Sequence, residues 1–349
     1  MSEPTAIVST ACRCAVGLLP ETAAAAVRAG IVRIQDHPFM VDQEGEPLRG
    51  AVEPKVPQDA HGIARLLALT TTTLASLIER TPILAQAPTV PVLLAVPEHR
   101  PGFGPPHETQ ILAAARSVRP GLDVRIAARG HAGALHALLL GQQLLERRQA
   151  QLVMVGGVES YFHADTIEWL VEHRQLQAGG TRSGFFPGEA AGFAVLMGES
   201  VRRACRLPAL AVLRGVHSEH ETALIKTDAV NQAKALTAAI RGAAAHLRAG
   251  ELCDRILCDL NGERYRTDEW STTLLRIPGL LRHGAGRPAD YEAPSRSWGD
   301  VGAASGILLC VLAIAAWQRG YAPGDRALLF AGSEQGLRAV VILQAPSER

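Results

Sequence analysis

The feature that most constrains this chain is a strand, a tight elbow, an apolar helix and a second strand in direct succession. A strand pattern at residues 124–128 runs into Gly130 and His131, an apolar helix pattern continues to residue 148, and a second strand pattern covers 152–155. This order forms a crossover between parallel strands, with the helix packed on one face of the sheet. It predicts an α/β protein with a buried elbow at His131.

The same alternation runs through the whole chain and begins again after a linker at residues 199–207. Helix patterns cover residues 20–28, 63–79, 108–118, 131–148, 231–249 and 301–318. Strand patterns cover residues 6–10, 90–96, 124–128, 152–155, 192–197, 209–216, 255–260, 327–331 and 339–344. Alternation of this kind is typical of mixed or parallel sheets covered by helices. We therefore predict two comparable β/α halves, residues 1–204 and 205–349, in one compact unit.

Five segments carry a further pattern in a fixed order. They are Ala6-Ile7-Val8-Ser9-Thr10 with Val27-Arg28-Ala29-Gly30-Ile31; the elbow at His131 with Gly156-Gly157-Val158-Glu159; Phe186-Pro187-Gly188-Glu189-Ala190-Ala191-Gly192-Phe193; Asp259-Leu260-Asn261-Gly262-Glu263; and Trp298-Gly299-Asp300-Val301-Gly302-Ala303-Ala304-Ser305. In this order they resemble the β-ketoacyl synthases of the thiolase-like superfamily over nearly the whole chain. The resemblance implies a thiolase-like fold, with duplicated halves in a five-layer α-β-α-β-α arrangement.

The same resemblance implies that the catalytic positions of the family are altered here. It places His131 where the family has its nucleophilic cysteine, and Glu263 where it has the first of two histidines. The second histidine falls at Gly299, or at Asp300 with a one-residue shift. A cysteine at a helix start is activated by the helix dipole, whereas an imidazole gains nothing from that field. Carboxylates repel the negative charge that the histidines stabilise, so we expect no catalytic residue among these four.

Two interpretations of this former reaction centre remain open. His131, His136, Glu263 and Asp300 can form a buried polar cluster held by hydrogen bonds, with His131 as a neutral histidine that fills a vacated pocket. A cluster of histidine and carboxylate side chains can instead bind a divalent metal or support hydrolysis. The lack of an activated nucleophile favours the first interpretation.

Composition excludes several classes of function. Thirty-five basic against 34 acidic residues, with no basic block, argue against nucleic-acid binding. The N-terminus lacks the basic segment of a signal peptide, so we expect a cytoplasmic protein. The uncharged run at 301–318 opens with small residues, which favours a buried helix over a membrane span. The six cysteines lack zinc-site spacing, and the sequence predicts neither a metal nor a cofactor.

Two functions from different classes follow from the resemblance. The short chain, the altered site and the segments at 27–31, 39–42 and 45–48 are similar to thiolase-like proteins encoded beside PAAR-repeat and effector proteins in type VI secretion clusters. This implies a non-catalytic adaptor whose partner is an effector or a PAAR-type protein. The alternative is an acyltransferase or acyl-binding partner in fatty-acid or polyketide metabolism, which meets an acyl carrier protein. A plugged pocket favours the adaptor, and an open acyl tunnel favours the alternative.

Two surfaces are candidate interfaces. We predict a homodimer in which the strand at 152–155 pairs with its twin across a two-fold axis. Residues 266–294 are the least periodic stretch, rich in glycine, arginine and proline, and this composition predicts a surface loop. Within it, residues 266–287 with Trp270 have the composition of an interface edge, although a solvated loop without a partner explains them equally well.

Overall fold

The computed structural model describes residues 3–41, 45–177, 181, 183–225, 227–282 and 290–347. Its strands are β1 Thr5–Cys14, β2 Gln35–Val41, β3 Pro47–Gly50, β4 Val90–Val96, β5 Leu122–Arg129, β6 Leu152–Ser160, β7 Glu189–Gly198, β8 Ala211–His220, β9 Arg255–Cys258, β10 Tyr291–Glu292, β11 Arg326–Gly332 and β12 Leu337–Gln344. Its helices are α1 Pro20–Arg28, α2 Ile63–Arg80, α3 Ile83–Gln86, α4 Pro105–Ser117, α5 Gly133–Glu146, α6 Ala164–Glu172, α7 Glu199–Ala204, α8 Lys234–Ala244, α9 Arg264–Leu274, α10 Ser295–Trp298 and α11 Ser305–Gln318, with short 3₁₀ turns at Pro278–Leu280 and Gly302–Ala304.

The main sheet consists of two five-stranded runs with the same internal order. One run is β1-β7-β6-β4-β5, the other is β8-β12-β11-β9-β10, and in each the first three strands are antiparallel and the last three parallel. The runs meet only where Thr5–Ile7 of β1 pairs with Ala211–Leu213 of β8. The predicted duplication of β/α halves is therefore confirmed in the topology, while the domain boundary after residue 204 stays a prediction.

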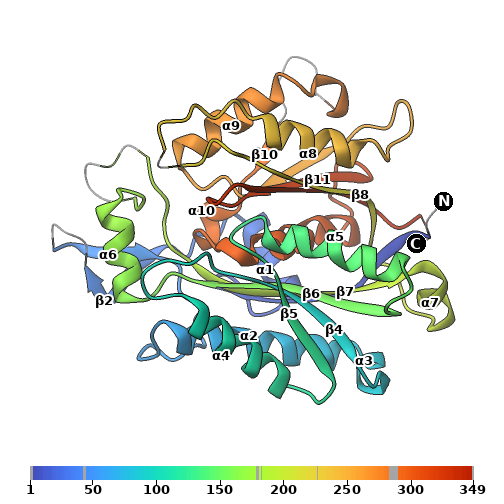
Figure 1. The fold of residues 1–349 in the computed structure, drawn as a ribbon, viewed down its shortest axis with the longest axis horizontal. Helices are drawn as coiled ribbons and strands as arrows, with labels where there is room; N and C mark the ends of the chain where they lie inside the picture. Colours follow the sequence, from blue (N-terminus) through green and yellow to red (C-terminus); the bar gives the residue numbers. More distant parts are fainter. Residues whose placement is uncertain are drawn as a thin grey trace.

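Helices cover both faces of each run and build five layers (Figure 1). Helices α2 and α4 lie on the outer face of the first run, and α8 and α9 lie on the outer face of the second. Between the runs lie α1, α5 and α11. Three buried apolar clusters fill the interfaces between these layers. The predicted α-β-α-β-α arrangement is confirmed.

Helix α11 is the centre of the middle layer. Its charge-free sequence is buried on almost every side, which agrees with the prediction of a core helix. A Cβ on Gly306 would lie 2.8 Å from the backbone nitrogen of Leu135 in α5, so the small residue permits the close approach of the two helices. Within the described ranges, no helix has the length and apolar character needed to cross a membrane.

The strand predicted to pair across a dimer interface lies in the interior of the sheet. Strand β6, which contains residues 152–155, pairs with β4 on one side and β7 on the other, so it has no free edge. The crossover through α5 returns the chain to the interior of the sheet, and β5 is left as the edge strand because it pairs with β4 alone. The prediction that 152–155 pairs with its twin is therefore wrong, and the homodimer itself stays a prediction.

The prediction of a surface loop at residues 266–294 is also largely wrong. Its first part is helix α9, in which Trp270 is 2 % exposed and stacks on Phe330 with ring centres 4.6 Å apart. Arg266 is buried as well. The high content of arginine and glycine predicted that this segment is exposed. Instead, buried acids neutralise Arg266, and the indole of Trp270 packs on β11. Residues 283–287 of the candidate interface lie outside the described residues. So does Asp42, which belongs to the segment at 39–42 that resembles the secretion-associated proteins.

Candidate functional site

The elbow before α5 is built by Gly130, whose φ of +74° lies in the left-handed region. A Cβ at this position would lie 2.8 Å from the carboxyl carbon of Glu98 and from Oγ of Ser333, so only glycine fits. The same Ser333 Oγ accepts the backbone N–H of Ala132 at 3.1 Å. This turn places His131 just before the helix start, with 5 % of its surface exposed.

The imidazole of His131 is held by an acid and faced by a cation. Its Nε2–H donates to both carboxylate oxygens of Asp300, at 2.8 and 2.9 Å. Nη2 of Arg266 lies 3.3 Å from each ring nitrogen. Burial and the Arg266 guanidinium lower the pKa of His131, but the contacts with Asp300 and the charge of Asp259 outweigh them, so the pKa is raised above its ordinary value.

Asp300 is the acceptor on which the cluster converges. Besides His131, it accepts hydrogen bonds from the Tyr161 hydroxyl at 3.1 Å, from the backbone N–H of Gly302 at 2.8 Å and from the Asn261 side-chain amide. Burial raises the pKa of Asp300, but the histidine, Arg266 and these donors hold it well below its usual range. The side chain is therefore a carboxylate at neutral pH.

Arg266 is the cation at the centre of the cluster, and sequence analysis missed it. Nη1 lies 2.7 Å from Asp259 Oδ2, and Nε lies 3.1 Å from Glu263 Oε2. Nη1 also donates to the carbonyl of Gly332 at 2.7 Å. A buried guanidinium is stable only when acids and carbonyls satisfy its donors, as they do here. The spacing of Glu263 and Arg266, three residues apart, was the available sequence signal.

Glu263 and Gly299, two further positions singled out in the sequence, make local contacts in the site. Glu263 directly precedes α9, and its carboxylate accepts hydrogen bonds from Asn261 at 3.0 Å and from Gln175 at 3.2 Å. Gly299 has a φ of +73° and lies so close to the carbonyls of Phe186 and Pro187 that a Cβ would come within 2.9–3.0 Å of them. Its role is the turn that carries Asp300 to the histidine.

Of the four residues expected to cluster, His136 is the one that the structure places elsewhere. It lies further along α5, and its Nδ1 is 3.0 Å from Oγ of Ser218 on β8. Burial lowers its pKa. His131, Glu263 and Asp300 do come together, joined by Arg266 and Asn261.

At the elbow, the described residues place the imidazole of His131, and not a thiol, just before α5. The raised pKa of His131 favours its imidazolium form, which has no lone pair for attack or for proton abstraction. The thiol of Cys12 lies on β1 and is fully buried, and burial raises its pKa well above the ordinary value. Within the described part of the chain, no group of three or more histidine, cysteine or acidic side chains is arranged to hold a metal ion.

A small cavity of about 230 Å³ remains beside the cluster. Its walls include His131, Tyr161, Arg100 and Glu159, and Arg100 Nη2 lies 2.6 Å from Glu159 Oε1. Burial raises the pKa of Glu98, a further wall residue. This volume is below the range of about 300–1,000 Å³ typical of ligand pockets. The centre of the site is thus largely filled by side chains, and a small recess with apolar and polar walls is left beside His131.

The layers, the strand order and the elbow define a thiolase-like α/β fold of the ketosynthase type. No family model matches this sequence, and no curated protein sequence matches it. Solved structures do match its fold. The ketosynthase from module 6 of the bacillaene synthase of Bacillus subtilis 168 matches with a TM-score of 0.80 and 14 % identity, over 99 % of this chain and 72 % of that chain.

Two further neighbours are matched over their full length. The ishigamide ketosynthase/chain length factor has a TM-score of 0.80 and 14 % identity, over 99 % of this chain and 100 % of that one. A type II polyketide ketosynthase, solved with its acyl carrier protein and bound to the hexaketide, has a TM-score of 0.81 and 12 % identity with the same coverage. At these identities the likeness shows the ketosynthase fold, and function has to be argued from the site.

Proposed function

We propose that this chain is a non-catalytic, ketosynthase-like protein that acts as an adaptor, helping to load or mature an effector of a bacterial type VI secretion system. The observation that carries the non-catalytic part is the pairing of His131 with Asp300 beneath Arg266, at the elbow where a condensing enzyme has its thiol. The secretion role rests on the sequence resemblance at residues 27–31, 39–42 and 45–48.

Condensation fails at this site for two physical reasons. Acyl transfer needs a nucleophile that forms a stable thioester, and an imidazole bound to the carboxylate of Asp300 does not supply one. Decarboxylation of a malonyl unit develops negative charge, which must be stabilised by hydrogen-bond donors that are not already paired with acids. Here Arg266 is committed to Asp259 and Glu263, and Asp300 adds a further negative charge.

Because side chains fill the centre of the site, we infer that the protein acts through its surface. Phe39 and Val41 on β2 are 65 % and 59 % exposed. Strands β2 and β3 form a separate two-stranded sheet, apart from the ten-stranded one. An exposed aromatic and an aliphatic side chain on a projecting hairpin are typical of a protein contact. We infer that this hairpin is the partner-binding element of the adaptor.

The competing proposal is an acyl-binding or acyl-transferring partner of a polyketide or fatty-acid system. The cavity beside His131 favours it, as does the neighbour solved with an acyl carrier protein. The two proposals differ in what the cluster does. The adaptor needs it only for stability, whereas the acyl partner needs it for ligand binding.

A capture and secretion assay in the native host tests the adaptor. The hairpin variant Phe39→Ser/Val41→Ser should reduce effector capture and delivery. The site variant His131→Asn/Asp300→Asn, which keeps polar but uncharged side chains, should leave both largely intact if it folds. Leu275→Ser is the control, because Leu275 is 83 % exposed but follows α9 in the opposite outer layer. Capture lost with the site variant and kept with the hairpin variant would reject the adaptor and favour the acyl partner.

A further inference from the structure

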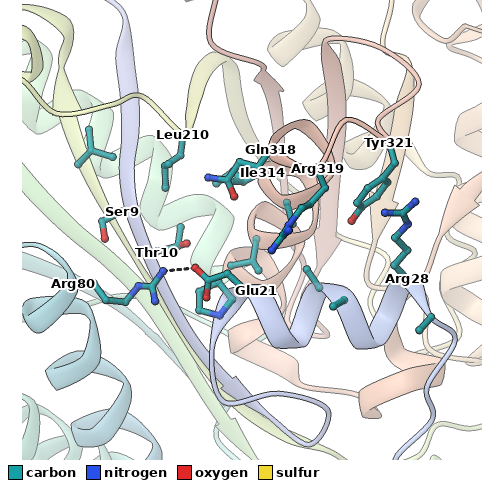
Figure 2. A pocket seen from close by; sticks show the side chains of 17 residues that line it. Ser9, Thr10, Glu21, Arg28, Arg80, Leu210, Ile314, Gln318, Arg319 and Tyr321 are labelled. Carbon is teal, nitrogen blue, oxygen red and sulfur yellow. Dashed lines mark hydrogen bonds and ion pairs between the residues drawn. The ribbon is translucent and has the colours of Figure 1, made fainter. Parts of the chain in front are cut away.

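A second and larger cavity, of about 760 Å³, shares no lining residue with the one beside His131. It opens where the two halves of the sheet separate, because β1 pairs with β8 only as far as Ile7. Beyond that point Val8, Ser9 and Thr10 of β1 form one wall, and α1 and the end of α11 form the others (Figure 2). The cavity is thus a consequence of how the duplicated halves join.

The charge around this cavity is unbalanced. Three arginines, Arg28, Arg80 and Arg319, line it together with a single acid, Glu21. Arg80 pairs with Glu21, and the guanidinium carbon of Arg28 lies 3.9 Å from the ring centre of Tyr321. Figure 2 shows the Arg319 side chain directed toward the cavity, and no described residue forms an ion pair or side-chain hydrogen bond with it. The lining therefore carries an excess of two positive charges.

The remaining walls are partly apolar and partly hydroxylic. Val311, Ile314 and Leu210 supply apolar surface. Ser9 and Thr10 are 8 % and 4 % exposed, and neither hydroxyl is hydrogen-bonded to any side chain or backbone group that the structure describes. Both residues line the cavity, so their hydroxyl groups are available to a ligand or water inside it.

We propose that this cavity binds a small organic anion. A carboxylate or phosphate head group lies against the guanidinium group of Arg319, and an apolar body packs against Val311 and Ile314. The volume lies within the range of about 300–1,000 Å³ that is typical of small-molecule sites. Arginine suits both head groups, because its planar fork of donors matches carboxylate and phosphate oxygens. This proposal is independent of the adaptor function.

Calorimetric titration of the full chain at low ionic strength tests the proposal. Octanoate and octyl phosphate are the probes, and the tighter of the two identifies the head group. Inorganic phosphate tests the head without an apolar body, and octyl glucoside tests the apolar body without charge. We expect saturable one-to-one binding of at least one alkyl anion, with markedly weaker binding of inorganic phosphate and octyl glucoside.

Three variants locate the binding. Arg319→Gln should weaken it about tenfold, the loss expected for one charge-assisted contact. Ala25→Trp should abolish it by filling the cavity from an exposed position on α1. Glu21→Gln should strengthen it by removing the acid, a gain that misfolding cannot produce. Arg147→Gln is the matched control, because Arg147 ends α5 as Arg319 ends α11 and is exposed outside the cavity.

Several outcomes would overturn the proposal. These are no saturable binding of either alkyl anion, equal binding of octyl glucoside, inorganic phosphate binding as tightly as octyl phosphate, or equal losses in Arg319→Gln and Arg147→Gln. Unchanged binding in a folded Ala25→Trp variant would likewise place the ligand elsewhere.

Discussion

Asp300 receives the Nε2–H of His131 with both of its carboxylate oxygens, at 2.8 and 2.9 Å, in a region from which solvent is almost excluded. This pair joins the turn at Gly299 to the elbow before α5, and so connects the two halves of the duplicated fold. Its charge state also makes the stability of the protein depend on pH.

The first prediction concerns that pH dependence. Because the folded-state pKa of His131 is raised, its pairing should stabilise the protein fully below the unfolded-state value of about 6.5, and this stabilisation should be lost as pH rises through the folded-state pKa. The difference in free energy of unfolding between wild type and His131→Gln should therefore shrink as pH rises above neutrality. Urea unfolding from pH 6 to 9 measures it.

His136→Gln provides a control of opposite sign. Burial lowers the pKa of His136, so its contribution should be present at high pH and should weaken as pH falls below the unfolded-state value of about 6.5. If both variants follow the same pH trend, the assignment of the effect to the pair of His131 and Asp300 is incorrect.

The second prediction concerns Arg266. Arg266→Met leaves Asp259 and Glu263 buried without their cation, and breaking a buried ion pair in this way costs about 3–5 kcal/mol. Urea denaturation should show this loss. Arg264→Gln, on the same helix but at an 83 % exposed side chain, should change stability by no more than about 0.5 kcal/mol. Equal effects of the two variants would contradict the central role of Arg266 in the cluster.

The third prediction is that a thiol alone does not restore condensation. Wild type and His131→Cys should both give no β-ketoacyl product from acyl and malonyl thioesters, because Asp300 and Glu263 oppose the developing negative charge. Mass spectrometry of the reaction measures the product, with an active ketosynthase as positive control. A malonyl-dependent product from wild type, lost in His131→Ala, would refute the non-catalytic proposal.

The fourth prediction concerns the packing of the middle layer. Ala303 is fully buried, and its carbonyl lies so near Gly157 that a Cβ there would come within 2.0 Å of it. Because Ala303 has no exposed surface, the larger side chain of Ala303→Leu should overpack its surroundings and lower stability by about 1–3 kcal/mol. Ala113→Leu, at an exposed position of α4, is the control. An unchanged melting temperature for Ala303→Leu would contradict the packing described.

The fifth prediction concerns oligomeric state. We expect a homodimer that uses the free edge of β5, since an unpaired strand edge is stable in solution only when it is covered or protected. Analytical ultracentrifugation at micromolar concentration should show a dimer, and Ile126→Lys on β5 should shift it toward monomer. A monomeric wild type would reject the prediction.

Local patterns in the sequence determined the elements and the class of fold. Strand β4 and helix α1 occupy the predicted residues, because apolar periodicity reports which face of a segment is buried. The elbow at Gly130 and the charge-free helix α11 could also be predicted, since a left-handed turn and a fully apolar helix depend mainly on their own residues.

Only the tertiary structure decided the strand order and the centre of the site. The interior position of β6 depends on pairing with β4 and β7, which its own sequence does not encode. The burial of Arg266 depends on acids at positions 259 and 263 and on a histidine brought from the other half of the fold. Composition therefore predicted an exposed arginine. An ion-pair cluster depends on groups that meet in space. Because these groups are far apart along the chain, the sequence does not show that they form one.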